Sequence, residues 1–181
     1  MHFSPGQRSQ AFKALNEAEE EAMRYYCIPP HRRQDLRYDL VMRQDEEWAP
    51  LPDVALARTQ RVMQIRPSTR AAHDFFRIQL NDPCILTVAR REAFDRDLYP
   101  FLVFILTHEM VHLVRLSTMI PDESELHLSP EAEEERVQKV AHAILSKAPD
   151  RRMAPILEKF CRESRLQPSW CHDGCSGMTV V

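Results

Sequence analysis

The apolar residues near the start of the chain recur at helical spacing. They form one stripe on a helix from about Ser9 to Tyr26, made of Ala11, Phe12, Leu15, Ala18, Ala22 and Tyr26. The acidic run "EAEEE" falls on the opposite face, and the prolines of "CIPP" end the helix because proline cannot continue its hydrogen bonding. We therefore predict an amphipathic N-terminal helix.

The next segment predicts short strands and one further helix. Leu36–Met42 alternates apolar and polar residues, as a half-buried strand does, and Val54–Arg58 and Arg61–Arg66 alternate more loosely. Ser68–Leu80 is predicted to be helical. Cys84–Ala89, "CILTVA", is predicted to be a strand, because isoleucine, leucine and valine fit a pleated buried surface.

The second half of the chain reads as helical. One helix should begin at Asp97, a good N-cap, and continue to about Leu116; it is apolar on nearly every side, which predicts a place at the centre of the protein. After the polar loop "MIPDESELHL", Ser129 and Pro130 should start a helix with one apolar stripe, which Pro149 stops. A last helix is expected around Ala154–Glu163.

These elements predict an α+β protein with one domain. A chain of 181 residues fits a single core, and three glycines against thirteen prolines leave no flexible linker. We expect the domain to cover residues 1–165 and an irregular, cysteine-containing tail to cover residues 166–181.

Composition and charge narrow the classes of function. Apolar residues make up 44% and charged residues 28%, as in ordinary globular proteins. A net charge of −3 gives no case for a nucleic-acid partner. The N-terminus lacks the features of an export or mitochondrial signal, so we expect a cytoplasmic protein. The longest apolar run, Phe101–Val114, is shorter than the roughly 20 residues that span a bilayer, so no membrane partner is expected. The oligomeric state stays open.

The candidate chemistry lies in "ILTHEMVHLV", within the predicted central helix. His108 and His112 are four residues apart, so both imidazoles lie on one face and can reach the same cation. Glu109 projects beside that cation, where a carboxylate can take a proton from an attacking water. Three polar groups on a core helix are costly unless a divalent ion compensates them. A hydrogen-bonded pair of core histidines is the plainer alternative.

This segment resembles the active-site helix of HExxH zinc metallopeptidases. The resemblance covers about ten residues, or about fifty with the following helix. It implies a zincin-like fold, a bound Zn²⁺ held by His108 and His112, Glu109 as general base, and a peptide or protein substrate. The longer metzincin pattern is absent, because Arg115 and Thr118 stand where it has glycine and histidine. The small gluzincin (minigluzincin-like) type remains.

The gluzincin type takes its third ligand, a glutamate, from a second helix about twenty residues on, where "SPEAEEERV" lies. The phase of the apolar stripe places Glu134 and Glu133 nearest the buried side, whereas Glu135 points away and Glu131 lies further off. We predict Glu134 as the ligand and Glu133 as its alternate. His127, in the loop, is an outside candidate.

Three further features remain open. Arg115 continues the face of the two histidines and could support the transition state or a ligand carboxylate. A second zinc site could form in the tail, from Cys161, Cys171, His172 and Cys175. The tail thiolates or the terminal "TVV" could instead enter the cleft and inhibit the protein.

A small zinc peptidase is the favoured function. The alternative is a zinc-binding regulatory or interaction module on the same scaffold, although such a module would not need Glu109. A di-iron helical bundle is disfavoured, because it requires a second Glu-x-x-His on another helix and the chain has none.

Overall fold

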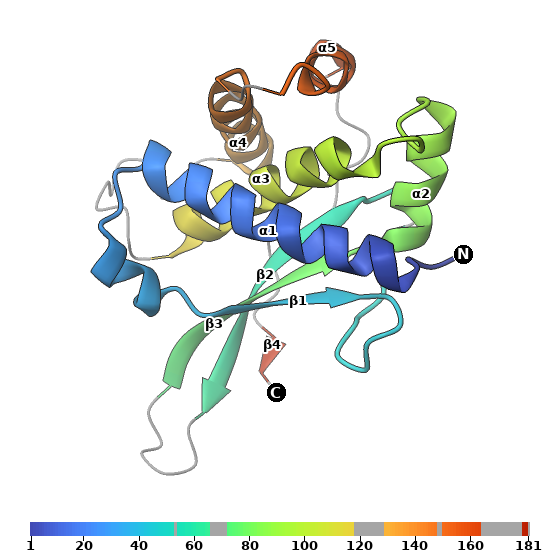
Figure 1. Ribbon diagram of the computed structural model, residues 1–181. Coiled ribbons are helices and arrows are strands. Elements are labelled where there is room, and N and C mark those ends of the chain that lie inside the picture. The colour runs from blue at the N-terminus through green and yellow to red at the C-terminus, as the bar shows by residue number, and fades with distance from the viewer. Residues whose placement is uncertain (53, 66–71, 118–128, 148–149, 164–178, 181) are drawn as a thin grey trace.

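The computed structural model describes residues 1–52, 54–65, 72–117, 129–147, 150–163 and 179–180. It confirms the α+β class. Helices α1 (Pro5–Tyr25) and α3 (Leu98–Leu116) lie side by side on one face of a mixed sheet (Figure 1). Helices α4 (Pro130–Leu145) and α5 (Met153–Glu163) pack against α3 away from that sheet (Figure 1). The central position predicted for the motif helix is therefore confirmed.

The predicted N-terminal helix is confirmed as α1. Ser4 caps it by accepting from the Gln7 backbone N–H at 3.3 Å, and the Gln7 side chain accepts from the Ser4 N–H at 2.8 Å. The helix ends at Tyr25, and Cys27 then adopts a positive φ of 53°. A 3₁₀ turn, η1 (Pro30–Asp35), leads from there to the sheet.

The sheet contains one strand that the sequence pattern assigned to a helix. β1 (Tyr38–Met42), β2 (Ala57–Ile65) and β3 (Ala72–Leu80) are arranged in the order β1-β3-β2, with β1 parallel and β2 antiparallel to β3. The prediction for Leu36–Met42 is confirmed, and the two short strands predicted around Val54–Arg66 are one strand, β2.

The helix predicted at Ser68–Leu80 is wrong over its described part, which is β3. Phe76, Ile78 and Leu80 are buried and alternate with the polar residues Arg77 and Gln79, which is the two-residue period of a strand. Arginine, glutamine and leucine favour helices, so local propensity concealed this alternation. Pairing on both sides, with β1 and β2, decides the outcome.

The strand predicted at Cys84–Ala89 is also wrong, because α2 (Asp82–Arg91) occupies this segment. Its buried apolar residues, Ile85, Leu86 and Ala89, follow helical spacing. Pro83 in the first turn and basic residues in the last turn are helix start and stop signals. The strand prediction rested on Ile85, Leu86 and Val88, which fit a strand as well as the buried face of a helix.

Helix α3 is enclosed by protein on nearly all sides. Its start at Asp97 is confirmed, although the Asp97 side chain makes no capping bond and pairs with Arg152 instead. Phe160 of α5 stacks on Phe101 and Phe104, with ring centroids 5.4 and 5.1 Å apart. By length and composition α3 could cross a membrane, but 89% of its apolar 18-residue stretch is buried inside the protein, as in the core helix of a globular protein.

The helices that follow agree with the sequence in their starts. Ser129 caps α4 by accepting from the Ala132 backbone N–H at 3.3 Å, as predicted, and α5 covers the helix expected at Ala154–Glu163. The stop predicted at Pro149 lies outside the described residues. In the tail, Thr179–Val180 form a short strand, β4, parallel to β2. These two residues therefore differ from the irregular tail that was predicted.

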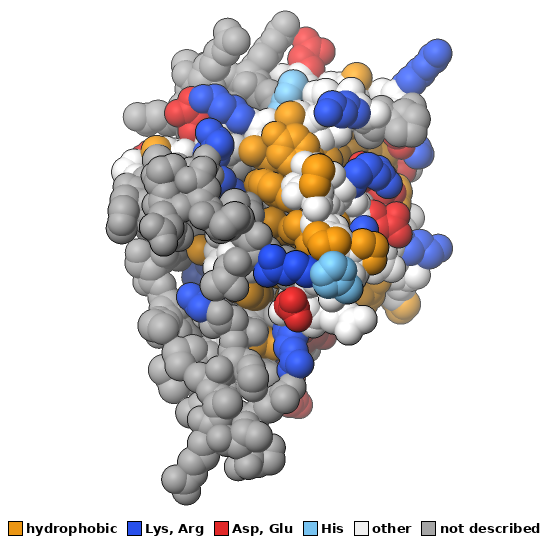
Figure 2. Space-filling view, turned by 90° about the vertical axis from the view of Figure 1, so that its left-hand side faces the viewer, with side chains coloured by type: hydrophobic (Ala, Val, Ile, Leu, Met, Phe, Trp, Pro, Cys, Tyr) orange, Lys and Arg blue, Asp and Glu red, His pale blue; other side chains and the backbone are white. Residues whose placement is uncertain are grey.

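The C-terminal ends of α1 and α3 reach the surface on one side of the molecule. Figure 2 shows the side of the molecule at the left of Figure 1, where hydrophobic side chains gather at the surface beside lysine and arginine side chains. The last turns of α1 and α3 point to this side (Figure 1). Tyr25 and Leu116, at the ends of these helices, are 41% and 38% exposed. The site described next lies further inside, where α3 is buried.

Candidate metal centre

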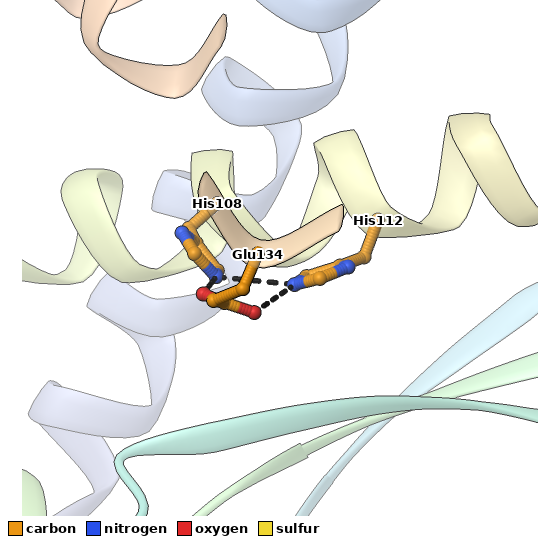
Figure 3. Close-up of side chains that lie close together, drawn as sticks. All are labelled: His108, His112 and Glu134. Atoms are coloured by element: carbon orange, nitrogen blue, oxygen red, sulfur yellow. Dashed lines mark hydrogen bonds and ion pairs between the residues drawn. The ribbon is translucent and has the colours of Figure 1, made fainter. Parts of the chain in front are cut away.

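Two buried histidines of α3 form the base of the site. His108 and His112 are one helical turn apart, and their rings point to the same side of the helix (Figure 3). Their Nε2 atoms are 3.2 Å apart, and their side chains are 3% and 9% exposed. Two polar nitrogens therefore face one point in the apolar core.

A carboxylate from α4 closes the site. Glu134 Oε1 lies 2.9 Å from His108 Nε2, and Glu134 Oε2 lies 3.2 Å from His112 Nε2 (Figure 3). The apolar stripe of α4, which includes the buried Val137 and Ala141, packs towards α3 and turns Glu134 to the histidines. The structure thus brings together the two histidines and Glu134, the glutamate predicted as the third ligand.

Glu133, the predicted alternate, faces another partner. Its carboxylate accepts two hydrogen bonds from Arg115, from Nε at 2.6 Å and from Nη2 at 2.8 Å. The Arg115 side chain is 7% exposed and that of Glu133 is 24% exposed, so this bidentate pair is partly shielded from water. Arg115 therefore ties the first turn of α4 to the end of α3, and the support that it was predicted to offer a substrate or transition state stays a prediction.

The donor atoms are close enough together to bind one metal ion. Bonds of about 2.0–2.1 Å to nitrogen and oxygen in a tetrahedron separate neighbouring ligand atoms by about 3.3 Å. Here the two Nε2 atoms are 3.2 Å apart, and each lies close to a different oxygen of Glu134, at 2.9 and 3.2 Å. One ligand atom of each residue lies within 4.8 Å of the others. His108, His112 and Glu134 can therefore hold a metal ion.

The three groups of the triad together favour a positive charge among their donor atoms. Burial alone would lower the pKa of His108, but the facing Glu134 carboxylate outweighs burial and raises it above the ordinary value. Burial would raise the pKa of Glu134, but His108 and His112 hold it well below its usual range. A proton or a metal ion at this point is therefore stabilised, and the two compete for it.

Gln138 orients His108 from the same helix as Glu134. Its Oε1 lies 3.2 Å from His108 Nδ1, and its side chain is buried. With Nδ1 donating to this amide oxygen, Nε2 carries the free lone pair that a metal requires. Sequence analysis missed Gln138. It stands four residues after Glu134, on the same face of α4, and that spacing is the signal that could have identified it.

Glu109 lies beside the triad and contacts the sheet. Thr59, in β2, donates its hydroxyl to Glu109 Oε2 at 2.8 Å and lies 3.2 Å from the Glu109 backbone oxygen. Both residues are buried. A shallow hollow borders Glu109 and His108, and its walls are mostly apolar: Leu56, Ala57, Phe104 and Ile105. A carboxylate outside the ligand set, a possible metal ligand and an apolar recess thus meet at one place.

Other candidates lie elsewhere or outside the described residues. Glu135 points away from the triad and pairs with Lys139, as its helical phase predicts, and Glu131 is exposed. His127 lies outside the described residues. The residues proposed for a second zinc site also lie outside them: Cys171, His172, Cys175 and the side chain of Cys161. Thr179 and Val180 pair with Val62 and Met63 of β2, the strand that carries Thr59. The inhibitory tail stays a prediction.

Comparison with protein-family models, with curated proteins and with solved structures finds no match. The interpretation of the site therefore rests on its own geometry, which is consistent with a metal site of the HExxH kind.

Neutralising Glu134 should remove metal binding, whereas neutralising Glu133 should not. Glu134→Gln takes away a ligand, so zinc affinity should fall by more than the roughly 10- to 100-fold typical of supporting residues. Glu133→Gln removes the same charge one position away but breaks only the pair with Arg115, so it should still bind zinc in a 1:1 ratio. Competition titration against a chromophoric chelator measures both affinities. Equal affinities in the two variants would contradict the assignment.

The metal-free triad should make stability depend on pH. The raised pKa of His108 gives stabilisation that is full below its ordinary value of 6.5 and is lost as pH rises through its folded-state pKa. The lowered pKa of Glu134 gives stabilisation that is full above 4.5 and is lost as pH falls through its folded-state pKa. Their attraction is therefore fully present between these two values.

Denaturant unfolding of the metal-free protein tests this dependence. The difference in free energy of unfolding between wild type and Glu134→Gln should shrink when pH is raised from about 6 to about 8.5. Stabilisation by added zinc should change in the opposite direction, since zinc displaces the proton. A wild-type advantage that grows with pH in the metal-free protein would be inconsistent with a protonated His108 facing Glu134.

Proposed function

We propose that this protein is a zinc-dependent peptidase that hydrolyses peptide bonds with Glu109 as general base. One observation carries the proposal: the metal-competent triad of His108, His112 and Glu134 has a fourth polar group, Glu109, beside it and outside its ligand set. A structural metal site does not require that carboxylate. The resemblance of "ILTHEMVHLV" to HExxH metallopeptidases supports the same function.

The donor set favours zinc among the common divalent ions. Two imidazoles and one carboxylate are typical of catalytic zinc sites, which keep a fourth position for water or substrate. Calcium and magnesium prefer sites made only of oxygen ligands. Zinc bound by this triad would polarise the scissile carbonyl and lower the pKa of the attacking water.

Within this mechanism the protein's own residues handle the proton. Glu109 accepts the proton of the attacking water and then delivers it to the leaving nitrogen as the peptide bond breaks. Thr59 occupies Oε2, so Oε1 is the oxygen available for this transfer. Gln138 keeps the Nδ1–H of His108 engaged, and the pair of Arg115 with Glu133 holds α4 so that Glu134 stays in place.

The hollow beside Glu109 suits an apolar part of a substrate. Its walls come from the start of β2 and from the turn of α3 before His108. Apolar parts of a substrate that lie against these walls would be removed from water. We extend the proposal to a peptide or protein substrate in the cytoplasm.

A zinc-binding regulatory module is the second candidate. The observation that favours it is the low exposure of His108, Glu109 and His112, which are 3%, 6% and 7% exposed when backbone and side chain are taken together. A site so enclosed suits a structural role of the metal as well as a reaction. The two functions differ in what Glu109 contributes.

Replacing Glu109 by glutamine should abolish hydrolysis and leave zinc in place. The amide cannot accept the proton, so kcat should fall by at least about 100-fold, whereas zinc content should stay at that of wild type. Zinc-loaded wild type and variant are incubated with a mixed peptide library, cleavage is followed by mass spectrometry, and metal is measured by atomic emission.

Glu135→Gln provides the matched control. It also neutralises one glutamate, but on the exposed side of α4, where Glu135 is 65% exposed and pairs with Lys139, so its kcat should equal that of wild type. If wild type binds zinc and cleaves no peptide of the library, the regulatory module replaces the peptidase as the better interpretation.

A further inference from the structure

We propose that Thr59 is a positioning residue for the general base: its hydroxyl, carried by β2, holds the carboxylate of Glu109 in one orientation beside the metal site. The inference rests on the proposed function and adds a residue outside the HExxH segment. It is carried by the buried contact between the sheet and α3.

The hydrogen bond is short and shielded from water. Thr59 Oγ1 lies 2.8 Å from Glu109 Oε2, and the two residues are 5% and 6% exposed. The hydroxyl has a single proton, and the Glu109 backbone oxygen lies further away, at 3.2 Å. The proton therefore goes to the carboxylate, where a charged acceptor makes the stronger bond.

The donor itself has little freedom to move. Thr59 lies within the antiparallel ladder of β2 and β3, opposite Ile78, which is fully buried. Its β-branched side chain has few accessible χ1 rotamers. Glu109, by contrast, has three rotatable side-chain bonds and stands at the edge of the hollow. The rigid partner therefore sets the position of the flexible one.

The two oxygens of the Glu109 carboxylate therefore have different roles. Oε2 is occupied by Thr59, and Oε1 accepts no hydrogen bond from any residue that the structure describes. Holding Oε2 therefore presents Oε1 for proton transfer without a search among rotamers, which lowers the entropic part of the barrier. A loss of this bond should affect kcat and leave zinc and substrate binding nearly unchanged.

Four variants separate a positioning role from a packing role. Thr59→Val keeps the shape and removes the hydroxyl, Thr59→Ser keeps the hydroxyl and removes the methyl group, and Thr59→Ala is a second variant without the hydroxyl. Thr107→Val is the matched control, because Thr107 is also a buried threonine and its hydroxyl has no hydrogen-bond partner in the described structure.

Kinetics on a peptide cleaved by wild type provide the first readout. With zinc content equal to wild type, Thr59→Val and Thr59→Ala should lower kcat by about 10- to 100-fold at an unchanged KM, as supporting residues of metal sites do. Thr59→Ser should recover most of kcat, and Thr107→Val should match wild type. The proposal is overturned if Thr59→Val hydrolyses like wild type, or if Thr59→Ser loses as much as Thr59→Val.

Crystal structures of the zinc-loaded variants provide a second readout that needs no activity. Glu109 should occupy one rotamer in wild type and Thr59→Ser, and should turn away or occupy several rotamers in Thr59→Val. An unmoved carboxylate in Thr59→Val overturns the proposal, as does a failure of both hydroxyl-free variants to fold. If wild type hydrolyses no peptide, the proposed function fails alone, because the carboxylate positions still decide the role of Thr59.

Discussion

Three electron-pair donors converge in the apolar interior of this protein, and the rest of the site depends on how that convergence is compensated. Two imidazole nitrogens and a carboxylate meet at separations of 2.9–3.2 Å between α3 and α4. Placing lone pairs and a negative charge together away from water is unfavourable unless a cation lies among them. Burial opposes a proton on His108, but the Glu134 carboxylate raises its pKa, so a proton can meet this need in the metal-free protein, as a divalent ion would in the loaded one.

The fold supports this arrangement by holding α3 from several sides. α1, β2, α4 and α5 all pack on it, so the two histidines stand on a helix with little room to shift. The bidentate pair of Arg115 with Glu133 and the contact of Gln138 with His108 join α4 to α3 on either side of Glu134. Thr59 joins β2 to Glu109. The polar contacts near the centre therefore come from α4 and β2, while apolar side chains supply the rest of the packing around α3.

Sequence analysis succeeded where one local pattern dominated and failed where two patterns competed. Helices α1, α3, α4 and α5 have long apolar periodicities and clear starts, and all were predicted. β3 and α2 were exchanged in type, because β3 contains helix-favouring residues and α2 contains strand-favouring ones. Pairing with two neighbouring strands overrode propensity in β3, and the buried stripe of Ile85, Leu86 and Ala89 overrode it in α2.

The sequence by itself determined the part of the site that lies on one helix. The spacing of His108, Glu109 and His112 sets their directions, since an α-helix has a fixed pitch, and the phase of α4 narrowed the third ligand to Glu134 or Glu133. Only the tertiary structure decided what meets this helix. The pairing of Arg115 with Glu133, the contact of Gln138 with His108 and the bond from Thr59 to Glu109 span 18, 30 and 50 residues. Such contacts follow from how helices and strands pack, and periodicity along the chain carries no information about them.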